Sequence, residues 1–426
     1  MRTLYTIGIY LYTLDIRVVA LAGYKKARLM VKGWRESKKP KELKDLKDST
    51  EPLAWFHAAS LGEFEQARPV IEEFRKRHPD YRILLTFFSP SGYEVRKNYE
   101  QADIVRYLPM DTPRNVRRFL DTYRPTLVFF VKYEFWYNYL NELKRRNITT
   151  YIFSAIFREN QYFFKWYGKW FRNELFRCFS FIFVQNGLSM EWLGLYGFDE
   201  VDVAGDTRFD RVHQIAEAAE RDEVVEAFLN GYDGKVLVAG STWPPDESLI
   251  RRLTANNEQL KVILAPHVIS EEHLQQIEKN FPDSIRYSKV TELLNTKVTE
   301  AHSTTHQVLI IDNIGLLSKL YRYADVAYIG GGFGVGIHNI LEAITFGKPV
   351  LFGPNYRKFQ EANDIIARGG GWSHRNYDEL QNHLTPLLTD SESYTKASQA
   401  CKDYMNRNIG GTRRILRHVD EYLEEE

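Results

Sequence analysis

Residues 55–90 read WFHAASLGEFEQARPVIEEFRKRHPDYRILLTFFSP, and this stretch predicts the architecture of the chain. It contains two short apolar runs, residues 55–60 and 83–89, separated by an amphipathic segment, Phe64–Arg77. A helix between two buried strands is typical of a crossover that leaves the strands parallel. The stretch therefore predicts a βαβ unit.

The same alternation continues toward the C-terminus in two series. The first series continues with the runs IVRYLPM, TLVFFVKYE, TTYIFSAI and FIFVQN. The second contains KVLVAGS, KVILAPH, VLIIDN, VAYIGGG and PVLFGP. Strands alternating with helices predict an α/β fold of two Rossmann-like, doubly wound domains. Ligands of such domains bind at the carboxyl ends of the strands, where we expect a cleft between the domains.

The boundary between the two domains is expected near VAGDTRFDRV, residues 203–212, because a charged helical stretch, Gln214–Leu229, and a new strand follow it. We predict a first domain over residues 48–207 and a second over 208–411. A charged helix over residues 412–426 is expected to cross back onto the first domain. Residues 1–47 precede both domains and form a separate N-terminal segment, with a helix followed by a basic linker.

Composition excludes several classes of protein. With 426 residues, 44% hydrophobic and 27% charged, the chain has the profile of a globular protein rather than a disordered one. The formal net charge is +1, so no global field points to a nucleic-acid partner. The two cysteines, Cys178 and Cys401, have neither metal-ligand nor redox spacing, which predicts a reducing compartment and no disulfide.

The N-terminal segment combines an apolar face with a basic stretch. Residues 3–14 are uncharged, but Asp15 and Arg17 leave this run short of the roughly 20 residues of a membrane span. Residues 25–47 hold ten Lys or Arg against three acids, which favours an anionic cytoplasmic leaflet. A helical spacing of 3 and 4 places six apolar residues on one face: Leu4, Ile7, Leu11, Leu14, Val18 and Leu21.

Two arrangements of this segment fit the pattern. The helix lies in a membrane interface with the basic stretch beside it, or it docks on the protein's own core. A second segment, residues 158–181, interleaves five basic residues with many aromatic ones. It fits either a further membrane contact or an aromatic core helix with extended cations. We favour an interfacial helix that peripherally attaches the protein to an anionic membrane surface.

The first loop with candidate chemistry follows the strand Trp55–Ala59. Gly62 permits a tight turn there, and Glu63 begins the next helix. The helix dipole favours an ionised carboxylate at this position, which suits a general base. The alternative is an acidic residue that only complements the dipole, because such residues are common in a first helical turn.

A glycine-rich loop marks the second domain in the sequence YIGGGFGVGIHNILE, residues 328–342. Glycines let backbone amides approach a phosphate, and Glu342 is placed to accept hydrogen bonds from ribose hydroxyls. The alternative is a loop that only requires a positive φ. The spacing does not match a dinucleotide fingerprint. The candidate phosphate-loop residues are Gly331, Gly332, Gly334, Gly336 and His338.

Other strand ends carry weaker signals. APH (265–267) and DNIG (312–315) each follow a strand of the second domain. KYEFWYN (132–138) follows a buried strand of the first domain, and Arg208 lies between the domains. Charges at such positions serve either a site or a structural ion pair. His267 and His338 lack a third partner at metal-ligand spacing, so we predict no metal and no cofactor.

In order, these motifs resemble the membrane-associated 3-deoxy-manno-octulosonate (Kdo) transferases of lipopolysaccharide synthesis, inverting enzymes of the two-domain GT-B fold. The family's S-V-G-E appears as residues 60–63, its E-T-E-L-W-P-N as 132–138 and its G-x-x-K-F-D as 205–210. Its A-P-R-H, D-T-M-G-E and G-G-H-N-x-L-E match, with changes, three further stretches: residues 265–267, 312–316 and 336–342. The resemblance covers nearly the whole chain.

The resemblance implies transfer of Kdo from CMP-Kdo to a lipid A precursor, lipid IVA, at the cytoplasmic face of the inner membrane. Glu63 matches the family's general base, and Lys132, Glu134 and Arg208 match further catalytic positions. The residues that match the CMP site are Pro266, His267, Ile314, Gly315, Leu316, Asn339, Ile340, Leu341 and Glu342.

Four positions depart from the family pattern. Lys132 replaces the first Glu of E-T-E, Arg208 replaces a Lys, and Leu316 replaces a Glu. The Arg of A-P-R-H is missing, which leaves His267 to neutralise phosphate. Two alternatives stay open: another GT-B transferase or epimerase that uses a nucleoside-diphosphate sugar, and a catalytically silent membrane-surface binding protein.

Overall fold

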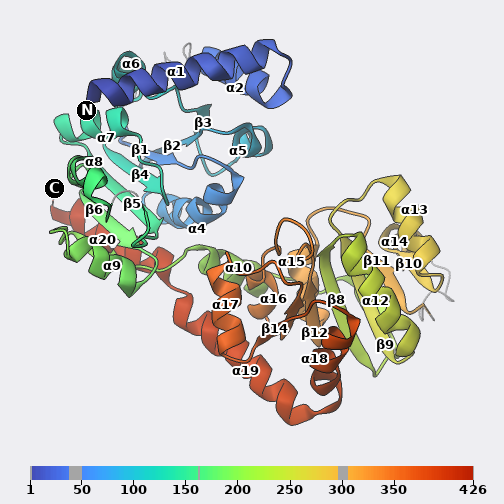
Figure 1. Ribbon diagram of the computed structural model, residues 1–426. Helices are drawn as coiled ribbons and strands as arrows, with labels where there is room; N and C mark the ends of the chain where they lie inside the picture. The colour runs from blue at the N-terminus through green and yellow to red at the C-terminus, as the bar shows by residue number, and fades with distance from the viewer. Residues whose placement is uncertain (1, 38–49, 162–163, 296–305, 426) are drawn as a thin grey trace. The chain divides into compact units, whose positions relative to one another are not determined.

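The computed structural model describes residues 2–37, 50–161, 164–295 and 306–425 (Figure 1). The chain divides into two compact units. The N-terminal unit contains residues 1–211 and 409–426, and the C-terminal unit contains residues 212–408. The division falls inside helix α10 (Arg208–Glu217), a few residues beyond the boundary expected from the sequence.

The N-terminal unit is built on a parallel sheet, which has seven strands within the described ranges. Their order is β3 (Ile104–Tyr107), β2 (Arg82–Phe87), β1 (Leu53–His57), β4 (Leu127–Val131), β5 (Thr149–Ala155), β6 (Phe181–Val184) and β7 (Val201–Val203). The order of the strands reverses between β1 and β4, which lie side by side in parallel register. Such a reversal places a crevice at the carboxyl ends of these two strands.

Both faces of this sheet are covered, so its strands are apolar almost throughout. Along β1, Trp55 faces one hydrophobic core and Phe56 faces the other. The first core is closed by α6 (Pro113–Tyr123), α7 (Tyr137–Arg145), α8 (Lys169–Phe176) and α9 (Gly187–Gly194). The second is closed by α4 (Leu61–Arg77) and α20 (Gly411–Glu425), with α5 (Pro90–Arg96) beside them.

Helix α20 packs on the N-terminal unit although it follows the C-terminal unit in sequence. Its Ile415, Leu416 and Val419 are fully buried in the core beside α4. Burial of such side chains contributes about 1.5–3 kcal/mol each. Asp420 also accepts a hydrogen bond from Arg77 at 2.8 Å. These contacts hold the end of the chain on the first sheet.

Helices α1 (Arg2–Leu21) and α2 (Lys25–Glu36) pack on the N-terminal unit through one face of each. Ile16 and Ala20 of α1 and Trp34 of α2 are buried against Tyr107 and Met110. The opposite face of α1 is exposed and includes the six residues that the spacing predicts: Leu4, Ile7, Leu11, Leu14, Val18 and Leu21. The helix thus docks on its own unit and still presents an apolar face. By length and composition alone, Arg2–Leu21 also passes the test for a membrane span. The basic residues 38–47 lie outside the described residues.

Part of residues 158–181, which were predicted to form a second membrane contact, is buried in the core of the N-terminal unit. For that part the prediction is wrong. Leu175, Phe176 and Phe179 are buried beneath β4–β6, and the Arg172 guanidinium lies 3.6 Å from the centre of the Tyr196 ring. These aromatic residues supply the apolar cover that this sheet face needs. Trp166, in the short helix η2 (Trp166–Gly168), is 89% exposed.

The C-terminal unit repeats the doubly wound plan. Its parallel sheet, counted within the described ranges, has seven strands in the order β10 (Ser284–Arg286), β11 (Val308–Ile310), β9 (Leu260–Pro266), β8 (Lys235–Thr242), β12 (Val326–Ile329), β13 (Val350–Phe352) and β14 (Gly371–Ser373). The order reverses between β8 and β12. The prediction of two doubly wound α/β units is therefore confirmed.

Helices cover this sheet as well. They are α11 (Glu223–Leu229), α12 (Pro244–Asn256), α13 (Glu271–Asn280), α14 (Tyr287–Asn295), α15 (Leu317–Leu320), η4 (Tyr321–Tyr323), α16 (Leu341–Ile344), α17 (Gln360–Ala367), α18 (Tyr377–Thr389) and α19 (Ser391–Asn408). The expected single helix over 214–229 is two helices, α10 and α11. Asp222 accepts hydrogen bonds from the amides of Val224 and Val225, and this N-cap starts α11.

Candidate active site

Glu63 lies where β1 ends and α4 begins, at the reversal of the first sheet. It is the third residue of α4 and is half-buried, and the Ser60 hydroxyl donates a hydrogen bond to its carboxylate. Gly62 does not make a tight turn, which corrects the sequence-based expectation. Its φ lies outside the left-handed region, and a Cβ there would meet only the Ser60 hydroxyl, at 3.8 Å.

The neighbouring strand β4 ends in a cation and a carboxylate. Lys132 has a φ of 58°, a left-handed conformation that is costly for a residue with a Cβ. Its amide donates to the Phe153 carbonyl at 3.0 Å, which holds the turn. Glu134 accepts a hydrogen bond from the Trp136 indole at 2.7 Å. The reversal of the sheet therefore brings Lys132 and Glu134 to the strand end next to that of Glu63.

A buried histidine that the sequence analysis did not single out lies beside Glu134. His57, the last residue of β1, is fully buried, and its Nε2 atom is 3.4 Å from Glu134 Oε2. Trp136 Nε1 lies 3.1 Å from the same Nε2 and 2.7 Å from Glu134 Oε2. The other ring nitrogen, Nδ1, lies 3.1 Å from the Thr86 carbonyl and 2.9 Å from the Thr86 hydroxyl. The sequence signal that could have identified His57 is a polar residue at the end of an otherwise apolar strand.

Arg208 is held by a buried carboxylate at the end of β7. Its Nε donates to Asp206 at 2.9 Å, and Gln66 of α4 donates to the other oxygen at 2.9 Å. Burial raises the pKa of Asp206, but the Arg208 charge and these hydrogen bonds outweigh it and lower the pKa overall. Gln66 follows Glu63 by three residues, so α4 links the Arg208 pair to the face that carries Glu63.

In the C-terminal unit, the glycine-rich loop follows β12 at the reversal of the sheet. Four of its amides are hydrogen-bonded within the protein: Gly331 donates to Asp246 at 3.0 Å, Gly334 and Gly336 donate to the Gly331 carbonyl, and His338 donates to the Gly330 carbonyl. A Cβ on Gly332 would lie 2.6 Å from the Gly353 backbone. Close packing and the positive φ of Gly331 and Gly336 account for these glycines, and a phosphate contact from this loop stays a prediction.

Three flat rings stack beside this loop. Ring centroids of His267 and His338 are 4.6 Å apart, and those of Trp243 and His267 are 4.7 Å apart. Burial, and then the neighbouring His267, lower the pKa of His338. A neutral His338 supplies a ring face rather than a charge for phosphate. Trp243 was not predicted from the sequence.

The remaining predicted CMP residues fall into two groups. Ile314 is 87% exposed, Gly315 is exposed in a left-handed conformation, and Leu316 is half-buried. Asn339 donates to Glu342 at 3.1 Å, which fixes that carboxylate. By contrast, Ile340 and Leu341 are fully buried and Pro266 is buried within β9, so a direct contact from their side chains to a nucleotide is not supported.

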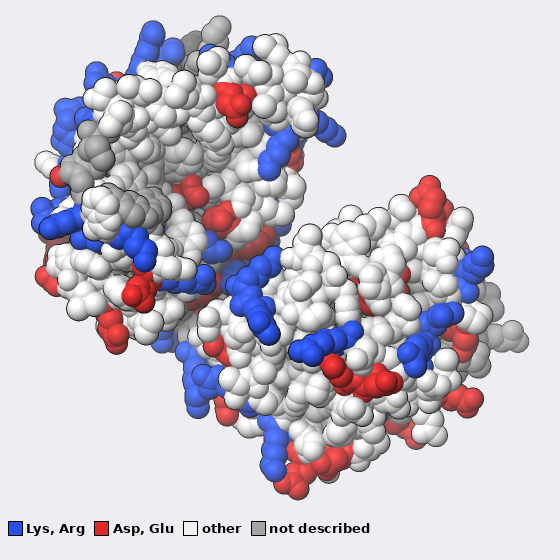
Figure 2. Space-filling view, viewed as in Figure 1, with Lys and Arg blue, Asp and Glu red and all other residues white. Residues whose placement is uncertain are grey.

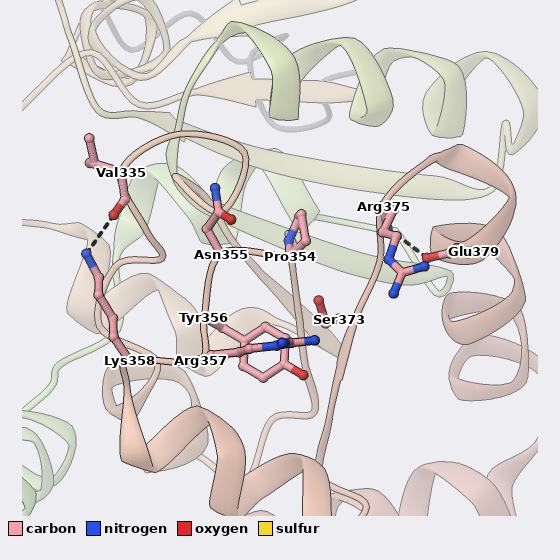
Figure 3. A pocket seen from close by; sticks show the side chains of 9 residues that line it. All are labelled: Val335, Pro354, Asn355, Tyr356, Arg357, Lys358, Ser373, Arg375 and Glu379. Carbon is pink, nitrogen blue, oxygen red and sulfur yellow. Dashed lines mark hydrogen bonds between the residues drawn. The ribbon is translucent and has the colours of Figure 1, made fainter. Parts of the chain in front are cut away.

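A cavity of about 710 Å³ near the glycine-rich loop carries three cations. Arg357 and Lys358 follow β13, and Arg375 follows β14; in Figure 3, Ser373 lies between the guanidinium groups of Arg357 and Arg375. Lys358 Nζ donates to the Val335 carbonyl at 2.6 Å. These residues were not predicted from the sequence; they lie just after two strands, in PNYRKF and SHR.

A second cavity, of about 470 Å³, opens in the N-terminal unit beside Glu134. Aromatic rings and two polar side chains line it: Tyr5, Tyr133, Glu134, Phe135, Trp136, Gln161 and Phe171. Aromatic walls with a carboxylate suit a sugar, whose ring packs on apolar faces while its hydroxyls donate hydrogen bonds. Within the described ranges, no group of three or more His, Cys, Asp or Glu residues is placed to hold a metal ion.

Comparison with known proteins now identifies the chain. Residues 32–211 match the family model described as 3-deoxy-D-manno-octulosonic-acid transferase (kdotransferase). Residues 32–211 thus carry the Kdo transferase domain, and the chain is similar to Kdo transferases over most of its length. It is 27% identical over 342 residues to the 3-deoxy-D-manno-octulosonic acid transferase of Aquifex aeolicus, covering 79% of this chain and 86% of that protein. Kdo transferases are glycosyltransferases of lipopolysaccharide biosynthesis, so the chain is assigned to this class of enzyme.

Other relatives agree. The chain is 28% identical over 338 residues to the enzyme of the same name from Chlamydophila psittaci, covering 76% of this chain and 74% of that one. It is 26% identical over 391 residues to a bifunctional glycosyltransferase/methyltransferase of Fusobacterium nucleatum, covering 89% of this chain but only 59% of that longer protein.

Comparison with solved structures gives information about the fold. A UDP-GlcNAc 2-epimerase from Neisseria meningitidis superposes with a TM-score of 0.59 at 16% identity, over 87% of this chain and 99% of that one. A glycosyltransferase from Rickettsia africae superposes with a TM-score of 0.54 at 12% identity, over 89% and 100%. At these identities the likeness concerns the fold, which is GT-B.

Proposed function

We propose that this Kdo transferase moves Kdo from CMP-Kdo to a lipid A precursor, lipid IVA, with inversion and with Glu63 as the general base. The observation that carries the proposal is the place of Glu63. It is a half-buried carboxylate at the reversal of the first sheet, and among the described residues its hydrogen-bond partner is the Ser60 hydroxyl. A carboxylate so placed has lone pairs free to accept the proton of an incoming hydroxyl.

The chemistry of the transfer needs one base and one stabilised leaving group. The acceptor hydroxyl loses its proton to Glu63 while its oxygen bonds to the anomeric carbon of Kdo. The bond from that carbon to the CMP oxygen breaks, and its electron pair leaves with CMP. One displacement inverts the configuration. Arg208, held by Asp206, and Lys132 supply positive charge for this step.

The donor is assigned to the C-terminal unit. CMP-Kdo carries a phosphodiester and a carboxylate, and Arg357, Lys358 and Arg375 offer cations to such an anion. We assign to these cations the neutralisation of phosphate that the missing Arg beside His267 would otherwise provide. The stacked rings of Trp243, His267 and His338 suit the flat face of the cytosine. Glu342, with Asn339, is assigned to the ribose hydroxyls, and Ile314 and Leu316 to apolar contact.

The acceptor is assigned to the aromatic cavity of the N-terminal unit. Glu134 and Gln161 would bind glucosamine hydroxyls while Tyr133 and Phe171 pack on the sugar. The exposed apolar face of α1 is assigned to the membrane that holds the lipid acceptor. We infer peripheral attachment at the cytoplasmic face of the inner membrane, because half of α1 packs on its own unit.

Release of CMP from CMP-Kdo in the presence of purified lipid IVA tests the proposal. Acceptor-dependent CMP release, with a Kdo-lipid product of inverted configuration, is the expected result. Interconversion of UDP-GlcNAc and its 2-epimer would favour the epimerase alternative. Lipid binding with neither reaction would favour a silent binding protein.

A further inference from the structure

A third cavity lies in the N-terminal unit, between α1, α2 and the start of α6. Its volume is about 500 Å³. Its walls come from one helical turn of α1, from Trp34 of α2 and from the segment that leads into α6: Tyr10, Thr13, Leu14, Arg17, Trp34, Pro109, Met110, Thr112, Arg114, Asn115 and Arg118. None of these residues belongs to the site proposed for Kdo transfer.

The charged side chains that line this cavity are all positive. Arg17, Arg114 and Arg118 line it, and its lining contains no Asp or Glu. Among the described residues, none of the three arginines forms an ion pair, whereas many other arginines of the chain do. Asp111, next to the cavity in sequence, is turned to other partners: it accepts hydrogen bonds from Tyr5 and from the amides of Asn138 and Tyr139. The cavity therefore offers three uncompensated guanidinium groups.

Other features of the walls also favour an anion. Helix α6 begins at Pro113 with Thr112 as its N-cap, so the positive end of the helix dipole points toward this cavity. Trp34, buried in the wall, has an indole Nε1 donor without an acceptor among the described residues. Polar groups that donate thus predominate over groups that accept.

The cavity borders the exposed apolar face of α1. Tyr10 and Leu14 line the cavity and are 53% and 57% exposed, and Leu11 and Val18 continue the exposed surface along the helix. In Figure 2, Lys and Arg side chains gather along the edge of the N-terminal unit where α1 and α6 lie, while the surface over α1 is mostly uncharged. A ligand seated here meets cations at one end and apolar side chains at the other.

We propose that this cavity binds the phosphomonoester headgroup of a membrane lipid, whose acyl chains lie against the exposed face of α1. A phosphomonoester carries a charge of about −1.5 to −2 and three acceptor oxygens, which matches three guanidinium donors better than a singly charged phosphodiester does. The site orients the N-terminal unit on the bilayer by a specific contact. It does not depend on the proposed transfer reaction.

Sedimentation of the full-length protein with vesicles tests the site. Vesicles of phosphatidylcholine are doped with phosphatidic acid, a phosphomonoester, or with phosphatidylglycerol, a phosphodiester, at amounts that give equal surface charge. We expect the protein to bind the phosphatidic acid vesicles about tenfold more tightly, because each phosphomonoester offers the three guanidinium groups more charge and one more acceptor oxygen than a phosphodiester does. The doubly substituted protein Arg114→Gln/Arg118→Gln should lose this preference.

A matched control removes the same charge elsewhere. Lys26→Gln/Arg117→Gln alters two exposed cations of α2 and α6 that do not line the cavity, so it should weaken binding to both vesicles equally and keep the preference. Equal binding of the unaltered protein to both vesicles would overturn the proposal, as would equal effects of the two double substitutions. Full displacement from phosphatidic acid vesicles by inorganic phosphate at equal phosphate concentration would also overturn it, because the source would then be free phosphate.

Discussion

Two carboxylates occupy the same place in the two units and differ in what surrounds them. Glu63 is the third residue of α4, after the first strand of its unit, and Asp246 is the third residue of α12, after the first strand of the other. Asp246 is fully buried and accepts hydrogen bonds from Tyr328 and from the amides of Gly331 and Trp243. Glu63 is half-buried, and within the described part of the chain it accepts a hydrogen bond from Ser60. The same topology thus builds a structural acid in one unit and a chemically available acid in the other.

The largest effect is expected at Glu63. Glu63→Gln should lower turnover by about 10²–10⁴, because the amide keeps the shape but cannot accept the acceptor proton. CMP-Kdo binding and the melting temperature should stay unchanged. Glu65→Gln on the same helix is the control, since its carboxylate pairs with Arg96 at 3.2 Å. Steady-state CMP release checks this; turnover of Glu63→Gln within about threefold of the unaltered enzyme would contradict the assignment.

At Asp246, by contrast, we expect a substitution to lower the stability of the protein. Asp246→Ala removes the acceptor of three donors, of which the Tyr328 hydroxyl and the Gly331 amide are buried, and a buried donor left unsatisfied costs about 1–3 kcal/mol. We expect the C-terminal unit to unfold at a lower denaturant concentration while the N-terminal unit is unaffected. Calorimetry of the full chain separates the two transitions. A variant of full stability would show that the two carboxylates are not distinguished by their surroundings.

A third carboxylate, that of Asp111, is expected to make the stability of the protein depend on pH. Burial raises the pKa of Asp111 to about 6, despite hydrogen bonds from Tyr5 and two backbone amides that lower it. The folded state therefore holds the proton more tightly than the unfolded state, whose pKa has the ordinary value of 3.8. Its contribution to stability is present below about pH 4 and is lost as the pH rises to about 6, by at most about 3 kcal/mol. Denaturation at several pH values, with Asp111→Asn as the comparison, measures it; an identical pH dependence in both proteins would exclude this role.

A smaller effect is expected from the indole shared by His57 and Glu134. Trp136→Phe keeps the ring but removes the N–H that contacts both groups. We expect the rate constant for CMP release to fall about tenfold to a hundredfold through misplacement of Glu134. Trp192→Phe, a half-buried tryptophan packed against the same core, is the control. Equal activity of both variants would show that the network only fills the core.

The smallest effect is expected at Gly62, beside Glu63. Because its φ is ordinary and a Cβ would meet no close neighbour, Gly62→Ala should change the free energy of unfolding by less than about 0.5 kcal/mol. If the acceptor passes close to this backbone, the KM for lipid IVA should rise severalfold. Gly194→Ala in α9, where a Cβ would have no neighbour within 4 Å, is the control. An unchanged KM would argue against close approach of the acceptor.

Sequence patterns predicted most strands but missed β7, β10 and β14. Each has three residues, and β7 reads Val-Asp-Val, which is too short to establish a periodicity of two. These strands form because a neighbouring strand offers hydrogen-bonding groups at the correct spacing, and that partner is distant in sequence. The same limit explains the basic cavity. Arg357 and Arg375 lie on different strand ends, and their convergence depends on the pairing of β13 with β14.

The sequence by itself determined the alternation of strands and helices, the apolar face of α1, the position of Glu63 at a helix start and the ordered motifs that resemble the Kdo transferases. These features depend on residues close together in the chain. The tertiary structure decided which face of α1 is buried, placed His57 beside Glu134 and surrounded Asp246 but not Glu63 with donors. Such contacts join residues far apart in sequence, and local periodicity does not encode which strands pair or which helix face finds a partner.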